Sequence, residues 1–364
     1  MTKVHFSWSD PAVAQDFTSA VSLHSHTSLS RETLTFIPRH TCDVPVLSQG
    51  IRRLEGIFRQ HHGHDINYND VWWTPPLTPR ASFELECRQI ETQLNLKPMV
   101  SLSDHDDTEA GVQLQAQGID SPVSVEWTIP VAPVFFHIGL HNIDPQMMPM
   151  LAAVTANPQP ERIREAFAQV AANPATLIIL NHPLWDEIRA GKAVHEERLD
   201  YLLSLVRPWV HALELNGLRP WSENRRVIEL AERLGMPTIS GGDRHGGEPN
   251  ANLNLTRATS FSEFAAEVRG GYSEVLLMPQ YREPIKLRFI GVMCDVLRDQ
   301  PGSRWADRIF WRNPDGVIHR LSDVMDEPAP GVIGQFIKLI RFADCRNVQF
   351  TLRWALADRS EAVL

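Results

Sequence analysis

Seven short apolar runs recur between residues 20 and 245, and stretches with helical periodicity lie between several of them. Several runs are continuously apolar, which is typical of strands that are buried on both faces of a parallel sheet or barrel. The repetition of strand and helix therefore predicts an α/β fold, either a (β/α) barrel or a doubly wound sheet. The predicted strands are 20–26, 99–105, 123–129, 133–140, 176–183, 211–217 and 236–245, and the clearest predicted helices are 160–173, 222–235 and 260–271.

Histidine and acidic residues gather in these runs, mostly where a run ends. His24 and His26 close the first run at positions i and i+2, a spacing that places two side chains on the same face of a strand. In a barrel the carboxyl ends of all strands open on one face, so these residues are expected to converge there as metal ligands. The other histidine and acidic residues of these runs are Asp104, His105, Glu126, His137, His182, Glu214, Asp243 and His245.

The last run carries a second motif of the same kind. Asp243-Arg244-His245 repeats the i, i+2 spacing directly after Gly241 and Gly242. Glycine has no Cβ, so these two positions permit a close approach of the backbone to a neighbouring group.

The ordered set of motifs resembles the PHP (polymerase and histidinol phosphatase) superfamily of metal-dependent phosphoesterases. It runs from His-x-His through Asp-His-Asp, a Glu eleven residues before a His, His-Pro and Glu-x-Asn to Gly-x-Asp-x-His. The resemblance implies a distorted (β/α)7 TIM-like barrel over residues 18–282, with metals at its carboxyl-terminal face.

Carried over by position, the resemblance implies two or three divalent ions. His24, His26 and Asp243 would hold the first ion. Glu126 would bridge it to a second ion, which His137 and His182 complete. His105 and His245 would hold a third ion, with Glu32 in the place where family members usually have Asp or His.

The resemblance also implies the chemistry. The divalent cations neutralise the oxygens of a phosphate ester, and a hydroxide that bridges the metals attacks it, with Glu126, Asp243 and His245 as the catalytic residues. Ligation by histidine with some carboxylate favours zinc, manganese or iron over magnesium or calcium.

Two arginines are candidates for binding the substrate phosphate, because arginine makes bidentate contacts with phosphate. Arg244 lies between two candidate ligands and Arg219 follows the sixth strand, although either could instead be paired with a nearby acid on the surface. Asp104, Glu214 and Asn216 are expected to orient ligand histidines rather than to bind metal.

Two regions depart from the alternation of strand and helix. Residues 40–80 read as a long insertion and residues 283–364 as a C-terminal appendage of unknown role. The four histidine-rich residues 61–64 are expected in a solvated loop, since no carboxylate or cysteine pattern accompanies them. Trp72 and Trp73 either anchor the insertion or pack over a substrate base.

Composition limits the function further. The formal net charge of −9 argues against binding to extended nucleic acid, which needs a basic surface. No apolar run approaches the ~20 residues of a membrane helix, and no leader is evident, so a cytoplasmic protein is expected. The four cysteines, among them Cys42, are far apart and are expected to be reduced thiols.

The function predicted from the sequence is hydrolysis of a small phosphorylated metabolite or nucleotide by a metal-dependent phosphoesterase. Two alternatives remain: an amidohydrolase-type enzyme that cleaves C–N or C–O bonds, and a non-catalytic PHP-like scaffold. The sequence gives no indication of the oligomeric state.

Overall fold

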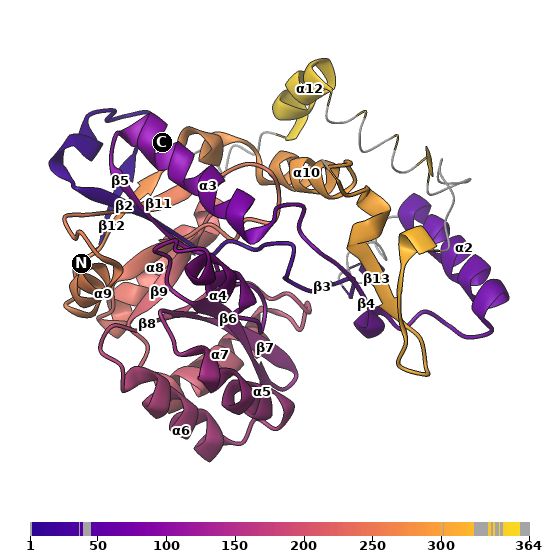
Figure 1. Cartoon of the computed structure of the whole chain (residues 1–364), viewed down its shortest axis with the longest axis horizontal. Coiled ribbons are helices and arrows are strands. Elements are labelled where there is room, and N and C mark those ends of the chain that lie inside the picture. The colour runs from indigo at the N-terminus through magenta and orange to yellow at the C-terminus, as the bar shows by residue number, and fades with distance from the viewer. Residues whose placement is uncertain are drawn as a thin grey trace.

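The computed structural model describes residues 2–35, 37–38, 45–300, 302–323, 334–335, 338, 342 and 345–356. These residues form a mixed α/β structure with three β-sheets (Figure 1). Cys42 and the start of the expected insertion, at 40–44, lie outside the described residues, as do parts of the expected appendage.

The first sheet has the strand order β1-β12-β11-β2-β5. The β1–β12 and β2–β5 pairs are parallel, whereas β11 runs antiparallel to both of its neighbours. The strands are β1 (Lys3–Phe6), β2 (Ser19–Leu23), β5 (Lys97–Ser101), β11 (Asn252–Thr256) and β12 (Glu274–Leu277).

The second sheet has the order β10-β9-β8-β7-β6. The neighbours β8, β9 and β10 are parallel, but β7 is antiparallel to both β6 and β8. The strands are β6 (Ser124–Val131), β7 (Val134–His141), β8 (Leu177–Leu180), β9 (Ala212–Asn216) and β10 (Thr238–Gly241). All seven strands predicted from the sequence are therefore present.

The second sheet meets the first at both of its own edges, β6 and β10, without merging into one continuous ladder among the described strands. One meeting point is an isolated bridge between His105 and Glu126, and the other is a bridge between Ser25 and Arg244. At the second, the side chain of Asn254 accepts a hydrogen bond from Ser240 N and donates to Ser240 O. The structure thus confirms an α/β fold but shows two abutting sheets in place of one closed barrel.

The direction of β7 explains part of this departure from a regular barrel. Only two residues separate β6 from β7, and a connection so short joins antiparallel strands, since a parallel pair needs a crossover of a dozen or more residues.

Helices cover the outer faces of the two sheets (Figure 1). The predicted helices are confirmed as α6, α8 and α9, with Phe167 of α6 packing on Trp127 in the largest hydrophobic core. The helices on the two large sheets are α3 (Pro79–Gln89), α4 (Glu109–Ala116), α5 (Met148–Ala156), α6 (Pro160–Ala171), α7 (Lys192–Val206), α8 (Trp221–Leu234) and α9 (Phe261–Arg269).

A third sheet, which we call the satellite sheet, joins the insertion to the C-terminal region. Its antiparallel order is β14-β13-β4-β3, and Trp72 of β4 stacks on Phe310 of β13 with ring centroids 5.6 Å apart. Trp72 and Trp73 are buried, as expected of residues that anchor the insertion. The strands are β3 (Glu32–Thr33), β4 (Val71–Trp73), β13 (Ile309–Arg312) and β14 (Ile318–Arg320).

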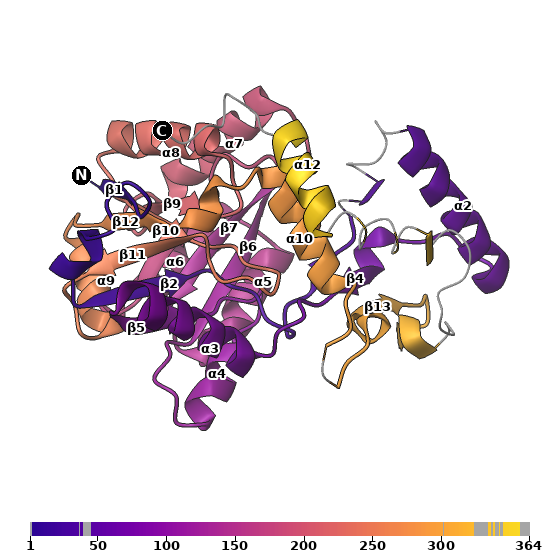
Figure 2. The ribbon, with the colours of Figure 1, turned by 90° about the horizontal axis from the view of Figure 1, so that it is seen from above.

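Three further helices accompany the satellite sheet. Helix α2 (Pro45–His62) lies on its far side, and α10 (Ile285–Val296) and α12 (Arg346–Leu356) lie between it and the two larger sheets (Figure 2). His62 ends α2, so the histidine-rich stretch is only partly the loop that was expected. None of the helices in the described part of the chain has both the length and the apolar character to cross a membrane.

Candidate metal centre

Histidine and acidic residues from both large sheets lie together in one buried cluster. Each of the predicted ligands lies within 3.7 Å of another member, measured between side-chain nitrogen and oxygen atoms. The cluster contains His24, His26, Glu32, His105, Glu126, His137, His182, Asp243 and His245, and we call it the His/Glu centre.

Glu126 occupies the middle of the His/Glu centre. It lies on β6 next to the seam between the sheets and is fully buried. Its carboxylate oxygens lie between 3.0 and 3.3 Å from ring nitrogens of five histidines: His24, His182 and His137 at Oε1, and His105 and His26 at Oε2.

These separations match ligands that share a cation. Two ligand atoms bound to one tetrahedral zinc ion at ~2.1 Å are about 3.4 Å apart. Moreover, three buried atoms, His24 Nε2, His26 Nε2 and Glu126 Oε2, form no hydrogen bond with any residue that the structure describes. Buried polar atoms without a partner are costly, and a divalent cation is a ligand that both imidazole nitrogen and carboxylate oxygen accept. The residues present therefore fit a metal site.

The donor atoms divide into three overlapping groups, within each of which all atoms lie within 4.8 Å of one another. The groups are His24–His26–Glu126, His105–Glu126–His137 and His26–Glu32–His105–His245. Asp243 Oδ1 lies 3.5 Å from His26 Nε2 and thus flanks the first group. Compared with the expected assignment, His105 stands in the second group as well as the third, and His182 Nε2 lies 3.4 Å from His137 Nδ1.

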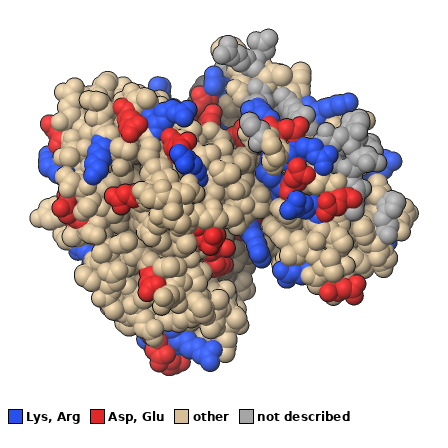
Figure 3. Space-filling model, in the orientation of Figure 1, with Lys and Arg blue, Asp and Glu red and all other residues tan. Residues whose placement is uncertain are grey.

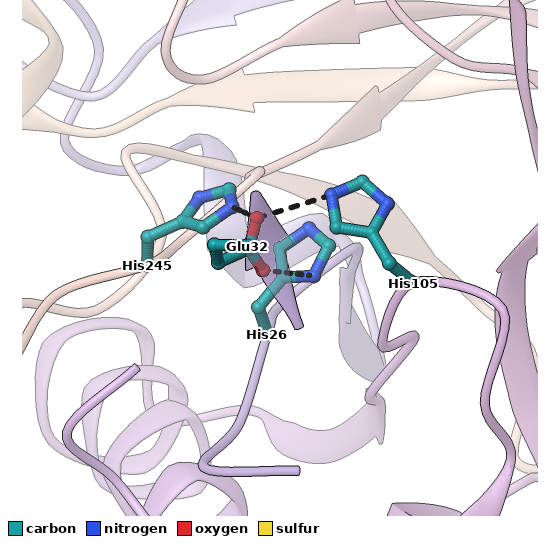
Figure 4. A group of neighbouring side chains, drawn as sticks. All are labelled: His26, Glu32, His105 and His245. Atoms are coloured by element: carbon teal, nitrogen blue, oxygen red, sulfur yellow. Dashed lines mark ion pairs between the residues drawn. The ribbon is translucent and has the colours of Figure 1, made fainter. Parts of the chain in front are cut away.

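Glu32 enters the His/Glu centre from the satellite sheet. Its Oε2 atom lies 3.3 Å from both His105 Nε2 and His245 Nε2 (Figure 4). On β3 it pairs with Trp73 of β4, so the satellite sheet sets its position. Ser30 supports it by donating a hydrogen bond of 2.6 Å to Glu32 Oε1.

Glu214 and Asn216 support the ligands, as expected. Glu214 Oε1 lies 2.5 Å from His24 Nδ1, and Oε2 accepts a hydrogen bond of 2.8 Å from the backbone N–H of His182. Asn216 donates to both Glu214 and Asp243. A carboxylate on the far nitrogen of a histidine fixes the ring and leaves Nε2 facing the metal position.

Asp104 has a different role from the one expected. Its carboxylate accepts hydrogen bonds from the backbone N–H and the hydroxyl of Thr27, at 2.6 and 2.7 Å, and so holds the turn that follows His26. Burial raises the pKa of Asp104 to about 7, despite the opposing effect of these hydrogen bonds.

Three candidate ligands have strained backbones. The φ angles of His24, His182 and Asp243 are +60°, +26° and +54°, in or near the left-handed region that side chains other than glycine rarely occupy. Such conformations cost on the order of 1–3 kcal/mol each and cluster at functional sites. The close approach expected at the last motif is also present, since a Cβ on Gly241 would lie 1.7 Å from Glu214 Oε1.

The carboxylates of the His/Glu centre are held in their charged form. Burial would raise the pKa of Glu126, but the imidazoles of His24, His137 and His105 outweigh it and hold that pKa well below its usual range. Burial also opposes ionisation of Glu32, whose pKa is nevertheless well below its usual range because His105 and His245 lie beside it. Anionic oxygens among imidazoles are the donor set of a transition-metal site.

The two arginines differ in what surrounds them. Arg244 is buried and donates to Glu86, Ser82, Gly246 O and His26 O, with an Nε–Oε1 distance of 2.9 Å to Glu86. Its guanidinium is thus bonded within the protein, which favours a structural role over the expected phosphate contact.

Arg219 instead stacks on Trp185, with its guanidinium carbon 3.6 Å from the ring centroid, and lies 5.8 Å from the ring of Phe289. It is only 6% exposed, and its Nε atom has no hydrogen-bond partner among the described residues. Trp185 lines a small recess together with His137 and His182. Arg219 therefore contacts a residue that lines this recess, and no ion pair joins it to a carboxylate of the described residues.

The sequence reasoning missed Asn181, Ser30 and Glu86. Asn181 donates a hydrogen bond of 3.0 Å to Glu126 Oε1, and its position directly before His182 at a strand end was the available signal. Glu86 carries no sequence signal, because its contact with Ser22 joins distant segments. Ser30 lies between His26 and Glu32 in the chain, and this position was the available signal.

No protein-family model matches the chain, and no curated protein matches it in sequence. Solved structures similar to it include a protein from Bifidobacterium adolescentis described as a "putative metal-dependent phosphoesterase" (16% identity, TM-score 0.35, covering 53% of this chain and 91% of that one). Another is an amidohydrolase from Chromobacterium violaceum (18%, 0.33, 47% and 83%). A third is PsfC from Pseudomonas syringae (13%, 0.38, 72% and 93%). At such low TM-scores and identities, these similarities establish neither the family nor the activity of this chain.

Proposed function

We propose that this protein is a metal-dependent phosphoesterase that hydrolyses a small phosphate ester. The observation that carries the proposal is the position of Glu126, whose two oxygens contact the imidazoles of both large sheets. On this proposal the two abutting sheets are a distorted (β/α)7 barrel of the PHP superfamily.

The His/Glu centre would hold two or three divalent ions, with zinc, manganese or iron favoured by its donors. Such ions, when bound, supply positive charge for the phosphate oxygens and lower the pKa of a water molecule. His24, His26 and Asp243 would hold one ion, and Glu126 with His137 and His182 another. His105, His245 and Glu32 would complete a third site.

Arg219 would bind the phosphate. It is a buried guanidinium held between two aromatic rings, and no ion pair is formed with it among the described residues. A buried cation without a counter-charge is costly, so an anionic ligand at this place stabilises it. Arginine also offers the paired N–H groups that match two phosphate oxygens.

The surface supports a small ligand over extended nucleic acid. Basic and acidic side chains are interspersed on the face drawn in Figure 3. Together with the net charge of −9, this surface offers no continuous basic track on that face for a phosphodiester backbone.

The test combines metal analysis with a substrate panel. Purified protein is analysed for bound metals and then assayed with p-nitrophenyl phosphate, nucleotides, sugar phosphates and histidinol phosphate, and in parallel with amides and lactones. The proposal expects bound divalent metal and release of phosphate, both lost in Glu126→Gln. Cleavage of amides or lactones with inert phosphates would instead identify an amidohydrolase, and a protein with neither metal nor turnover would be a scaffold.

A further inference from the structure

A pocket of about 490 Å³ opens beside the His/Glu centre. Its walls come from the loop after β10 and from helices α10 and α12. We propose that this pocket binds the alcohol portion of the phosphate ester, and that this portion is a polyhydroxylated group of nucleoside or glycosyl size. The inference rests on the proposed function.

The first argument for this proposal is the position of the pocket. His245, a member of the His/Glu centre, forms part of its wall, so a ligand in the pocket lies next to the candidate metal ligands. The recess on the other side, at His137 and His182, has a volume of only about 10 Å³. Of these two openings, only the pocket at His245 has room for the organic part of a substrate.

The size of the pocket carries the second step. Pockets for organic ligands have volumes of about 300–1,000 Å³. A volume of about 490 Å³ lies inside that range and exceeds what a bare phosphate needs. A nucleoside or a sugar fills such a space better than a methyl or ethyl group does.

The charges in the wall carry the third step. Arg353 pairs with Glu283 at 2.7 Å, and Arg298 lies 3.6 Å from Asp295. Asp295 Oδ2 also accepts a hydrogen bond of 2.7 Å from the backbone N–H of Gly247. Three of the four arginines in this wall thus face an acid, since Arg244 pairs with Glu86, and the wall also holds Glu248. The pocket therefore favours a ligand portion without a second phosphate group.

The uncharged part of the wall indicates the polarity of the ligand. Leu287 and Val292 give one side of the pocket an apolar surface, whereas Gln280, Gln300 and Gln349 bring amide groups. A wall with an apolar side and a polar side matches a hydroxylated ring system, which offers both an apolar face and hydrogen-bonding edges, better than it matches an alkyl chain.

Gly291 gives a direct way to block the pocket. It lines the pocket on α10, and a Cβ placed on it would meet no atom of the described residues within 4 Å. A large side chain at this position therefore projects into open space. Tryptophan has a higher helix propensity than glycine, so this replacement in a helix interior does not by itself destabilise the helix.

The experiment compares Gly291→Trp with a matched control, Gly56→Trp. Gly56 is also a helical glycine with no atom within 4 Å of its Cβ position, and it lies on α2, beyond the satellite sheet (Figure 2). Circular dichroism and thermal unfolding check that both variants are folded. Turnover is measured with adenosine 5′-monophosphate, glucose 6-phosphate and phenyl phosphate, and calorimetry measures binding of adenosine and glucose, which are not cleaved.

For Gly291→Trp, we expect the ratio of kcat/KM for the better large ester to kcat/KM for phenyl phosphate to fall at least about tenfold, with loss of binding of the matching alcohol. The control Gly56→Trp should keep the wild-type ratio of kcat/KM values and the wild-type binding of the alcohol. The ester whose kcat/KM falls most, adenosine 5′-monophosphate or glucose 6-phosphate, shows whether the pocket binds a nucleoside or a glycosyl group.

An unchanged ratio together with unchanged binding, or equal effects in the two variants, would overturn the inference. A wild-type protein that binds neither alcohol and prefers phenyl phosphate would also overturn it. If no phosphate ester is hydrolysed at all, the proposed function fails. Loss of adenosine or glucose binding in Gly291→Trp would still support the pocket in that case.

Discussion

Glu32 pairs with Trp73 across strands β3 and β4, and the same glutamate places Oε2 3.3 Å from the ring nitrogens of His105 and His245. The ring of Trp73 in turn lies 6.0 Å from that of His245. The satellite sheet and the His/Glu centre are therefore in direct contact. One group of candidate metal ligands depends on a sheet that lies outside the two larger ones.

The first prediction concerns Glu32 itself. Replacement by Gln removes the charge that faces His105 and His245, so the third ion should be lost while the ligands of the other two remain. Elemental analysis should show a fall of about one metal equivalent per chain. Thr33→Ala, an exposed change on the same strand, is the control, and equal metal contents in all three proteins would exclude Glu32 as a ligand.

A second prediction tests the role of the satellite sheet. Phe310→Ala removes the ring that stacks on Trp72 and should loosen β4, against which β3 is paired. The aromatic pair contributes about 0.5–1.5 kcal/mol beyond its buried area, so metal affinity at the Glu32 group should fall without general unfolding. Competition with a chromophoric chelator measures this affinity. Ile318→Ala, at a half-exposed position of β14, should leave it unchanged.

The third prediction concerns His182 and Asp243, whose φ angles are positive. Asparagine tolerates such a backbone, so His182→Asn and Asp243→Asn test the side chain with the least additional strain. Each variant should lose at least about 100-fold in phosphate release, since even the residues that support metal ligands are worth 10–100-fold. Circular dichroism spectra should stay close to that of the wild type. Turnover at the wild-type rate in either variant would remove that residue from the site.

Arg219 is the subject of the fourth prediction. Arg219→Met keeps an apolar side chain against Trp185 but removes the cation, so binding of the phosphate group should weaken. A hydrogen bond to a charged group contributes about 1.5–3 kcal/mol, which corresponds to a loss in kcat/KM of about 10- to 150-fold. Arg225→Met, an exposed change on α8, is the control. A loss of the same size with neutral substrate analogues would show that the effect is not phosphate binding.

The fifth prediction separates Arg244 from Arg219. Arg244→Met leaves the buried carboxylate of Glu86 without its partner, so the free energy of unfolding should fall by about 3–5 kcal/mol. Adding Glu86→Gln should restore part of this loss, because the uncompensated charge is then removed. Urea denaturation measures both effects. A stable single variant with impaired phosphate binding would support the substrate contact that the sequence suggested.

Much of the fold was accessible from local sequence patterns. All seven predicted strands and the helices at 160–173, 222–235 and 260–271 are present, because continuous apolar runs and amphipathic stretches depend on neighbouring residues alone. The convergence of the strand-end histidines was predictable for a related reason. Once the strands are known, the geometry of a sheet brings their ends together.

The elements that were missed depend on distant partners. In β11, the buried Asn252 and Asn254 donate to Leu215 O, Val21 O and Ser240 O, so a strand that reads as polar is nevertheless interior. The antiparallel direction of β7 was available from the short gap between the two predicted strands and was not used. The role of Arg244 could not be inferred, since Glu86 is far away in sequence and has no motif.

The pairing of β4 with β13 has a consequence for how the molecule matures during synthesis. Every candidate ligand precedes residue 246, whereas β13 begins at Ile309, so a nascent chain carries all of the candidate ligand histidines before the neighbour of β4 exists. Until then β4 has one side exposed, and an exposed strand edge pairs readily with other chains. A protein shortened before Ile309 would thus be prone to self-association, even though its ligand residues are complete.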